Sequence, residues 1–244
     1  MANHLLVGLS RQVTLERQMD VVANNVANMN TPGFKQQRMM FVEYLAKPEN
    51  GTGRQALPLS MVQDVAVLRD LREGPVNRTG NPLDLALQGN GYFAVETLDG
   101  PRYTRAGRFQ LDPERRLVDV NGLPVLDDAD GPIQIPAGVS DVTINGDGSI
   151  MTEQGPLGRI QVVRFEREQF MTEVGGGLYT TDEPPLAAED TMVIQGAVED
   201  SNVQPVVEMT QMTEILRQYQ SNQRLIDAEH ERQRSAIGRL TRVN

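Results

Sequence analysis

The sequence predicts an α+β fold, in which helices at the two ends of the chain accompany a central, mostly antiparallel β domain. Near both termini, apolar residues recur at alternating intervals of three and four, which is typical of one face of a helix. Between these regions the period shortens to two, and Asn-Gly and Asp-Gly dipeptides separate the apolar runs. We therefore expect a helix and turn at 1–34, a connecting segment at 35–75, a β domain at 76–200 and a helix at 201–244.

The N-terminal helix carries a narrow apolar seam, which is typical of a helix that packs against another helix in a coiled coil. Two of its positions, Gly8 and Gln12, are weak places in the pattern. Asn24 and Asn28 lie four residues apart on one face, where they either hydrogen-bond to a neighbouring helix or remain solvated. The seam positions are Leu5, Gly8, Gln12, Leu15, Met19, Val22, Val26 and Met29.

A turn is expected directly after this helix. Proline disfavours the helical conformation of Thr31, and Pro32-Gly33 suits the two central positions of a type II turn. The helix should therefore end near Asn30, and the ring of Phe34 should pack against another part of the protein. A loop-rich stretch from Lys47 to Leu59 is expected to follow.

The central β domain is predicted from short β-type runs and the turns between them. Leu83, Leu85 and Leu87 alternate with other residues, and further runs lie at 92–97, 108–111, 117–120, 142–144, 160–165 and 192–194. Asn-Gly and Asp-Gly between such runs are strong hairpin signals. These dipeptides are Asn90-Gly91, Asp99-Gly100, Asn121-Gly122, Asp130-Gly131 and Asp147-Gly148.

The C-terminal helix should exceed 30 residues, because no glycine or proline lies between Val206 and Ile237. Its seam is as narrow as the first one, so it favours a partner helix over a broad globular core. The two terminal seams can pair with each other or with those of neighbouring copies. The seam positions are Met209, Met212, Leu216, Tyr219, Gln223, Ile226, His230, Gln233, Ile237 and Leu240.

The acidic charge of the chain is concentrated in its middle. The net charge is −10 over 244 residues, yet residues 1–45 hold four bases and three acids, and residues 208–244 hold six bases and five acids. Nucleic acid is a poor partner for such a body, because affinity for a polyanion depends on basic side chains. No stretch has the length and apolarity of a membrane span, and the first ten residues lack the features of a cleaved signal peptide.

Three stretches of the chain, in this order, resemble the signatures of flagellar rod and hook proteins. They are residues 22–35, residues 80–93 together with 103–109, and residues 195–207 leading into the last helix. Possession of the central domain argues against the shortest rod proteins, and the modest length argues against a hook protein. The helix tail at 229–240 and the short body resemble the proximal branch of the rod family more than its distal branch.

The resemblance implies a structural subunit of the flagellar basal-body rod that transmits torque for motility. Its implied partners are copies of itself, other rod proteins and the flagellar type III export apparatus, through which it would reach the periplasm uncleaved. Both termini are implied to be disordered before assembly. The expected assembly interface is Leu15, Met19, Val22, Val26, Met209, Met212, Leu216, Tyr219 and Ile226. The family motif comprises Asn24, Asn25, Asn28, Thr31, Pro32, Gly33 and Phe34.

The sequence holds little material for catalysis or for a cofactor. It has no cysteine, and His4 and His230 are its only histidines, so His-based triads and metal sites rich in histidine or cysteine are not expected. Gly89-Asn90-Gly91 resembles half of a dinucleotide-binding fingerprint, but no helical pattern follows it, and we expect a hairpin turn there. We therefore expect a non-enzymatic protein with no cofactor and no small-molecule substrate.

Two alternatives to the rod interpretation remain, and calcium binding is a third possibility for one acidic segment. Asp127, Asp128 and Asp130 precede a glycine, but Ala129 stands where a calcium ligand is needed. A soluble coiled-coil adaptor would dimerise without the β domain. A secreted adhesin or carbohydrate-binding domain would need exposed aromatic residues, whereas the strand patterns around the central aromatics suggest a core. These aromatics are Tyr92, Phe93, Tyr103 and Phe109.

Overall fold

The computed structural model describes residues 2–46, 59–139 and 141–240. The chain divides into two compact units, of which the first comprises residues 1–27, 37–69 and 204–244 and the second residues 28–36 and 70–203. The chain therefore passes between the units four times. Apart from Leu59, the loop-rich stretch expected after the N-terminal motif lies outside the described residues.

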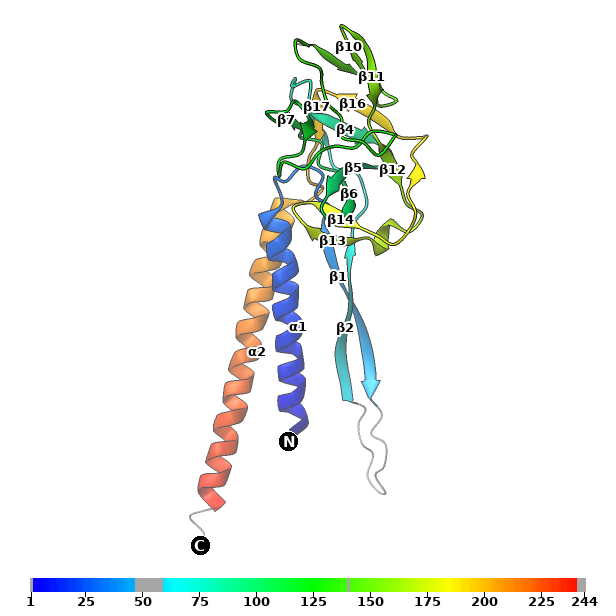
Figure 1. Ribbon diagram of the computed structural model, residues 1–244. Coiled ribbons are helices and arrows are strands. Elements are labelled where there is room, and N and C mark those ends of the chain that lie inside the picture. The colour runs from blue at the N-terminus through cyan, green and yellow to red at the C-terminus, as the bar shows by residue number, and fades with distance from the viewer. Residues whose placement is uncertain (1, 47–58, 140, 241–244) are drawn as a thin grey trace. The chain divides into compact units, whose positions relative to one another are not determined.

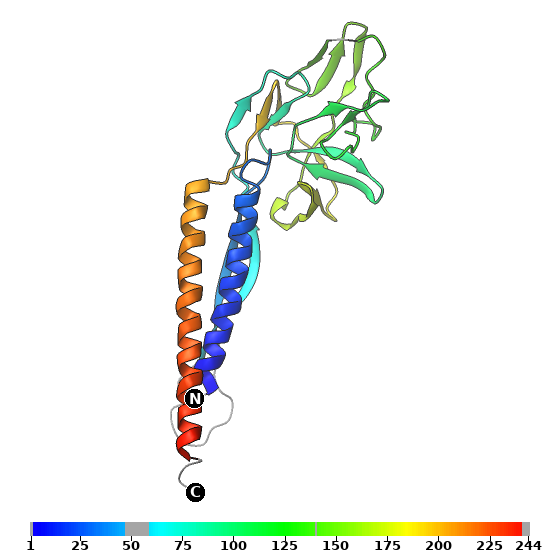
Figure 2. The same ribbon diagram turned by 90° about the vertical axis from the view of Figure 1, so that its left-hand side faces the viewer.

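The first unit contains both long helices, α1 (Ala2–Ala27) and α2 (Pro205–Leu240). They lie side by side and run in opposite directions, as Figures 1 and 2 show. Proline at the first position of α2 starts the helix without loss of a hydrogen bond, because the first amide groups of a helix have no partner within it. The 36 residues of α2 confirm the expected length, and α1 ends three residues before the predicted boundary.

A long β-hairpin completes the first unit, where the sequence predicts only a connecting segment. Strand β1 (Gln37–Ala46) pairs with β2 (Leu59–Arg69) in antiparallel register, with an irregularity between Met40 and Phe41. Helix α1 contacts both strands. The run from Met39 to Leu45 is rich in aromatic and β-branched residues, so its composition favours a strand.

The second unit is built from small antiparallel sheets, which confirms the predicted central β region (Figure 1). Its largest sheet has six strands in the order β13-β14-β6-β5-β12-β15. A three-stranded sheet has the order β11-β10-β9, and the remaining strands form the pairs β16-β4, β17-β3 and β7-β8. A short 3-10 helix covers Glu168–Phe170.

The strand bounds of the second unit are β3 (Val76–Arg78), β4 (Leu85–Gln88), β5 (Tyr92–Thr97), β6 (Gly100–Thr104), β7 (Gln110–Leu111), β8 (Leu117–Val118), β9 (Val142–Ile144), β10 (Ser149–Thr152), β11 (Gly155–Arg159), β12 (Val162–Arg164), β13 (Thr172–Gly175), β14 (Leu178–Thr180), β15 (Leu186–Ala187), β16 (Met192–Gln195) and β17 (Ala197–Glu199).

Most of the predicted turns lie where a strand reverses, but one does not. Asp99-Gly100 and Asp147-Gly148 stand in the β5–β6 and β9–β10 hairpins. The prediction of a hairpin at Asn90-Gly91 is wrong. The strand before it, β4, pairs with β16, and the strand after it, β5, pairs with β6 and β12. This dipeptide therefore connects two different sheets.

The core of the second unit lies on both faces of β5, because successive side chains of a strand point to opposite faces. Phe93 and Val95 belong to one buried apolar cluster, and Tyr92 and Ala94 belong to another. The rings of Phe93 and Phe109 meet edge to face at 5.1 Å. All four aromatic residues expected in the core are at most 7% exposed, so they offer no aromatic surface for a carbohydrate.

None of the helices in the described parts of the chain combines the length and the apolarity that a membrane crossing requires.

Candidate assembly surface

The inner faces of α1 and α2 meet through polar groups as well as apolar side chains. The amide of Gln12 donates to the hydroxyl of Tyr219 at 2.8 Å, and the amide of Asn222 donates to the carbonyl of Gly8 at 2.8 Å. A Cβ atom on Gly8 would lie 3.2 Å from Cγ1 of Ile226. The two weak positions of the predicted seam are therefore places where the helices approach closely or hydrogen-bond.

Asn25 and Glu208 form a buried polar contact between the two helices. The amide of Asn25 donates to Oε2 of Glu208 at 3.0 Å, and both residues are 1% exposed. Asn25 also pairs with both backbone groups of Gln37, at 2.8 Å each. The sequence predicts such a contact for Asn24 and Asn28, as one of two alternatives. The side chain of Asn28 accepts a hydrogen bond from the hydroxyl of Thr31 at 3.1 Å.

The predicted interface residues do not all lie on the inner face of the helix pair. In α1, Leu15 and Val22 are buried, while Met19 and Val26 are half-buried. In α2, Met212, Tyr219 and Ile226 are half-buried. Met209 and Leu216, however, are 49% and 46% exposed.

The face of α2 that contacts α1 differs from the predicted seam at every second position. Positions 208, 215 and 222 lie on this face, where the sequence predicts 209, 216 and 223. Glu208 and Asn222 are buried and contact α1, and Ile215 lies on the same side by helical spacing. A search for regularly spaced apolar residues cannot find this face, because two of these three positions are polar. Met209 and Leu216 are thereby left for contacts outside the helix pair.

Several large apolar side chains remain exposed on the helices, and we call them the outer apolar surface. Along α2, a shallow depression of about 600 Å³ is lined by Met209, Thr213 and Arg217 among others. Met209 and Leu216 are seven residues apart, so they share one flank of α2. The members of this surface are Val7, Leu9, Val13, Val206, Val207, Met209, Leu216 and Leu225.

The last four residues of the family motif, 31–34, fold as the predicted type II turn in the second unit. The amide of Phe34 donates to the carbonyl of Thr31 at 3.3 Å, and Gly33 has a φ of +71°, as the third position of this turn requires. Thr31 and Pro32 are half-buried, whereas Gly33 is buried and Phe34 is 3% exposed. The ring of Phe34 is therefore packed, as expected.

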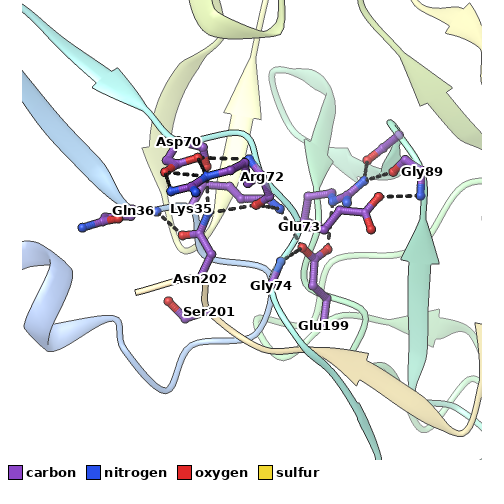
Figure 3. Close-up of polar contacts among 12 residues, drawn as sticks. Lys35, Gln36, Asp70, Arg72, Glu73, Gly74, Gly89, Glu199, Ser201 and Asn202 are labelled. Carbon is purple, nitrogen blue, oxygen red and sulfur yellow. Dashed lines mark hydrogen bonds and ion pairs between the residues drawn. The ribbon is translucent and has the colours of Figure 1, made fainter. Parts of the chain in front are cut away.

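Directly after this turn, a buried carboxylate binds two buried cations. Oε1 of Glu199 lies 2.6 Å from Nζ of Lys35, and its Oε2 lies 3.0 Å from Nε of Arg105. All three side chains are at most 4% exposed. Glu199 also accepts the amide of Gly74 at 2.9 Å, as Figure 3 shows.

The charge balance of this cluster affects the titration of its lysine. Burial lowers the pKa of the Lys35 ammonium, the negative charge of Glu199 opposes that effect, and the neighbouring Arg105 lowers the pKa further. Arg105 also donates to the carbonyls of Gly89 and Gly91, at 2.8 and 2.7 Å. The sequence does not reveal this cluster, because its members lie far apart in the chain, each in a different one of the three stretches that resemble the rod family.

Metal binding by acidic side chains finds no support in the described parts of the chain. Across the described parts of the chain, no three histidine, cysteine, aspartate or glutamate side chains gather in a way that could hold a metal ion. Oδ1 of Asp127 accepts the amides of Ala129 and Gly131, both at 2.9 Å. That carboxylate therefore stabilises its own turn.

Comparisons with known proteins agree with the three resemblances along the chain. Residues 5–35 match the flagella basal body rod protein family, residues 86–152 the D1 domain of the flagellar hook protein FlgE/F/G, and residues 194–239 the C-terminal region of the flagellar basal body rod FlgEFG proteins. These matches contain the motif turn, most of the core of the second unit and nearly all of α2.

Relatives that match along nearly their whole length are also flagellar basal-body rod proteins. The chain is 43% identical to the flagellar basal-body rod protein FlgF of Caulobacter vibrioides, over the whole of both chains. It is 34% identical to FlgF of Mesorhizobium japonicum, over 93% of this chain and 92% of that one. It is 30% identical to the rod protein FlgG of Bacillus subtilis, over 95% and 96%. The chain therefore belongs to the flagellar basal-body rod protein family, in which it is most like FlgF.

Proposed function

We propose that this structural, non-enzymatic rod subunit polymerises through the outer apolar surface of α1 and α2, in the proximal part of the rod. The observation that carries the proposal is that Met209 and Leu216, two of the apolar seam residues, stay about half exposed although α2 is already paired with α1. Packing them against a neighbouring subunit would remove apolar area from water, at roughly 25 cal/mol for each Å².

The partners in this proposal are copies of the same chain and other rod proteins, whose helices pair with the outer apolar surface as in a coiled coil. Oppositely directed helices with half-exposed apolar flanks suit such contacts, because a narrow seam covers only part of each helix. A surface that contacts a different surface on the next copy generates an open helical polymer. Such a polymer can transmit torque along its axis.

The proposal includes export through the flagellar type III apparatus and assembly in the periplasm. Isolated helices gain most of their stability from tertiary packing, so α1 and α2 are expected to be marginal before they meet their neighbours. Disordered ends would suit passage through a narrow channel and would fold on incorporation. In this scheme residues 1–34 and 201–244 are the polymerising parts, 76–200 the body and 35–75 the connection.

A deletion strain tests the proposal directly. Removal of the gene should abolish swimming and leave basal bodies without a complete rod in electron micrographs, and the wild-type chain should restore both. A strain that still swims without the gene would contradict the rod assignment. Restoration of swimming by a chain that carries aspartate at both Met209 and Leu216 would contradict the assembly surface alone.

A further inference from the structure

Three short segments of the second unit, residues 33–36, 70–74 and 199–203, hydrogen-bond to one another close to all four places where the chain passes between the units. The first segment follows α1 by a turn and leads into β1, the second follows β2, and the third leads into α2. We call these segments and the side chains that join them the clasp. The close-up in Figure 3 shows most of its polar contacts.

Asn202 joins all three segments of the clasp by itself. Its side-chain oxygen accepts the amide of Gln36 at 2.6 Å, and its side-chain nitrogen donates to the carbonyls of Asp70 and Arg72 at 2.8 and 2.9 Å. Its own amide donates to the carbonyl of Phe34 at 3.3 Å. The amide of Asp70 also donates to the carbonyl of Gln36 at 2.8 Å.

The buried ions act on the same backbone segments. Nζ of Lys35 donates to the carbonyl of Arg72 at 3.0 Å as well as to Glu199. The carbonyl of Glu199 accepts the amide of Gly33 at 2.8 Å, and its carboxylate accepts the amide of Gly74. Lys35 and Glu199 thus each hold main chain from a segment other than their own.

The buried ions of the clasp are expected to contribute little to the free energy of unfolding. Two buried cations face one carboxylate, and even a balanced buried ion pair contributes little relative to well-packed apolar residues, because desolvation offsets the attraction. Hydrogen bonds from one side chain to several backbone segments, however, fix the position of those segments relative to one another. A force applied through any one passage would be shared by the other segments.

We propose that the clasp is a mechanical junction, which holds the four chain passages together when torque loads the assembled subunit. This inference rests on the proposed function, because a load exists only if the chain is part of a rod that turns. Asn202 is a positioning residue in this scheme. Its loss should weaken the subunit under load more than at rest.

The experiment compares Asn202→Ala with Asn145→Ala in the deletion strain, at rising medium viscosity. Asn145 is an exposed asparagine that bonds to Ser149 within its own hairpin, so it controls for loss of an asparagine side chain. We expect the Asn202 variant to complete rods and swim normally in dilute medium, but to lose swimming at viscosities that the Asn145 variant and the wild type tolerate.

Amide exchange on the purified full-length chain tests the clasp without any load. In Asn202→Ala, the amide of Gln36 should exchange about tenfold faster, as the loss of one buried hydrogen bond predicts. The core amides of Leu117 and Val125, which donate to Ile133 and Leu117, should keep their wild-type rates. Equal acceleration of the core amides would mean that Asn202 stabilises the whole unit, which would overturn the proposal.

Two further outcomes in cells would also overturn it. One is swimming of the Asn202 variant at wild-type speed at every viscosity, and the other is failure of that variant to complete rods at all. If the wild-type chain itself fails to restore swimming, the proposed function is wrong. The exchange rate of Gln36 would still decide whether Asn202 holds the segments together.

Discussion

The amide of Gly33 donates to the carbonyl of Glu199 at 2.8 Å, although the two residues lie near opposite ends of the second unit in sequence. Gly33 makes this contact with a φ of +71°, and a Cβ atom there would lie 2.4 Å from the carbonyl carbon of Arg105. The glycine of the motif therefore has two independent reasons to lack a side chain.

Gly33→Ala should consequently destabilise the second unit by about 3 kcal/mol or more, because left-handed backbone strain adds to a clash with main chain. Gly122→Ala is the matched control. Gly122 has a φ of +82° and nothing lies within 4 Å of its Cβ position, so Gly122→Ala should lower the free energy of unfolding by about 1 kcal/mol. Urea denaturation of the two purified variants measures the difference, and equal losses would show that the close approach to Arg105 is unimportant.

Leu216→Asp should block assembly while sparing the subunit. Because Leu216 is 46% exposed, an aspartate there should change the stability of the isolated chain by less than about 1 kcal/mol. In an assembled rod it would place a charge in an apolar contact in every copy. Thermal unfolding of the purified chain and counts of complete rods measure the two effects.

Ser221→Asp is the control for this charge. Ser221 is exposed on α2 and lies on a different flank of the helix from Met209 and Leu216, so the variant adds the same charge to the same helix and should assemble. A large fall in the unfolding temperature of Leu216→Asp would mean that the leucine serves the helix pair itself. Normal swimming of both variants would remove Leu216 from the interface.

The third prediction concerns where the second unit ends in the sequence. A fragment of residues 70–203 keeps β17 paired with β3 and keeps Glu199 beside Arg105, whereas a fragment that ends at Ile194 loses both. The shorter fragment leaves the buried Arg105 without its carboxylate, so we expect it to unfold at a lower temperature. Circular dichroism during heating compares them, and equal midpoints would show that the β17 pairing and Glu199 contribute little.

Acid should weaken the β9–β10 turn through Asp147. Hydrogen bonds from the hydroxyl and amide of Ser149 hold the pKa of the Asp147 carboxyl below its usual value. A carboxyl with a lowered pKa in the folded state stabilises the protein above its unfolded-state pKa. That contribution disappears as the pH falls through the folded-state pKa.

Asp147→Asn should therefore make the free energy of unfolding depend less on pH in the acid range. Asparagine before glycine suits the same kind of turn, so the variant should fold normally at neutral pH. The stability difference between wild type and variant should be largest above about pH 5 and should shrink toward pH 3. Denaturant titrations at several pH values test this, and a difference that grows in acid would reverse the assigned sign.

Local signals in the sequence predicted those parts of the fold that local interactions decide. The run at 92–97 became β5 and the run at 142–144 became β9, with the same bounds, because turn dipeptides and β-type residues adjoin them. Proline and glycine after Asn30 marked the end of α1 to within three residues. Such signals act within a few residues and do not need knowledge of the partner strand.

The parts that the sequence analysis missed depend on distant partners. Asn90-Gly91 has the composition of a hairpin turn, but β4 finds its partner in β16, about a hundred residues later. The burial of Glu199 between Lys35 and Arg105 has no local signature, because a charged residue in a sequence normally indicates an exposed position. Asn25 was named only as a member of the family motif, and a contact between helices was expected instead of Asn24 and Asn28, whose spacing of four residues is that of one helix face.

The hydrogen bond between the amide of Asp70 and the carbonyl of Gln36 closes the base of the β1–β2 hairpin within the second unit. Everything from Gln37 to Arg69 is therefore an insertion whose two ends meet at fixed neighbouring points, and its length does not alter the framework that holds it. The hairpin can be shortened or extended without a change in the register of any strand of the second unit, so it is a natural place for variation in length.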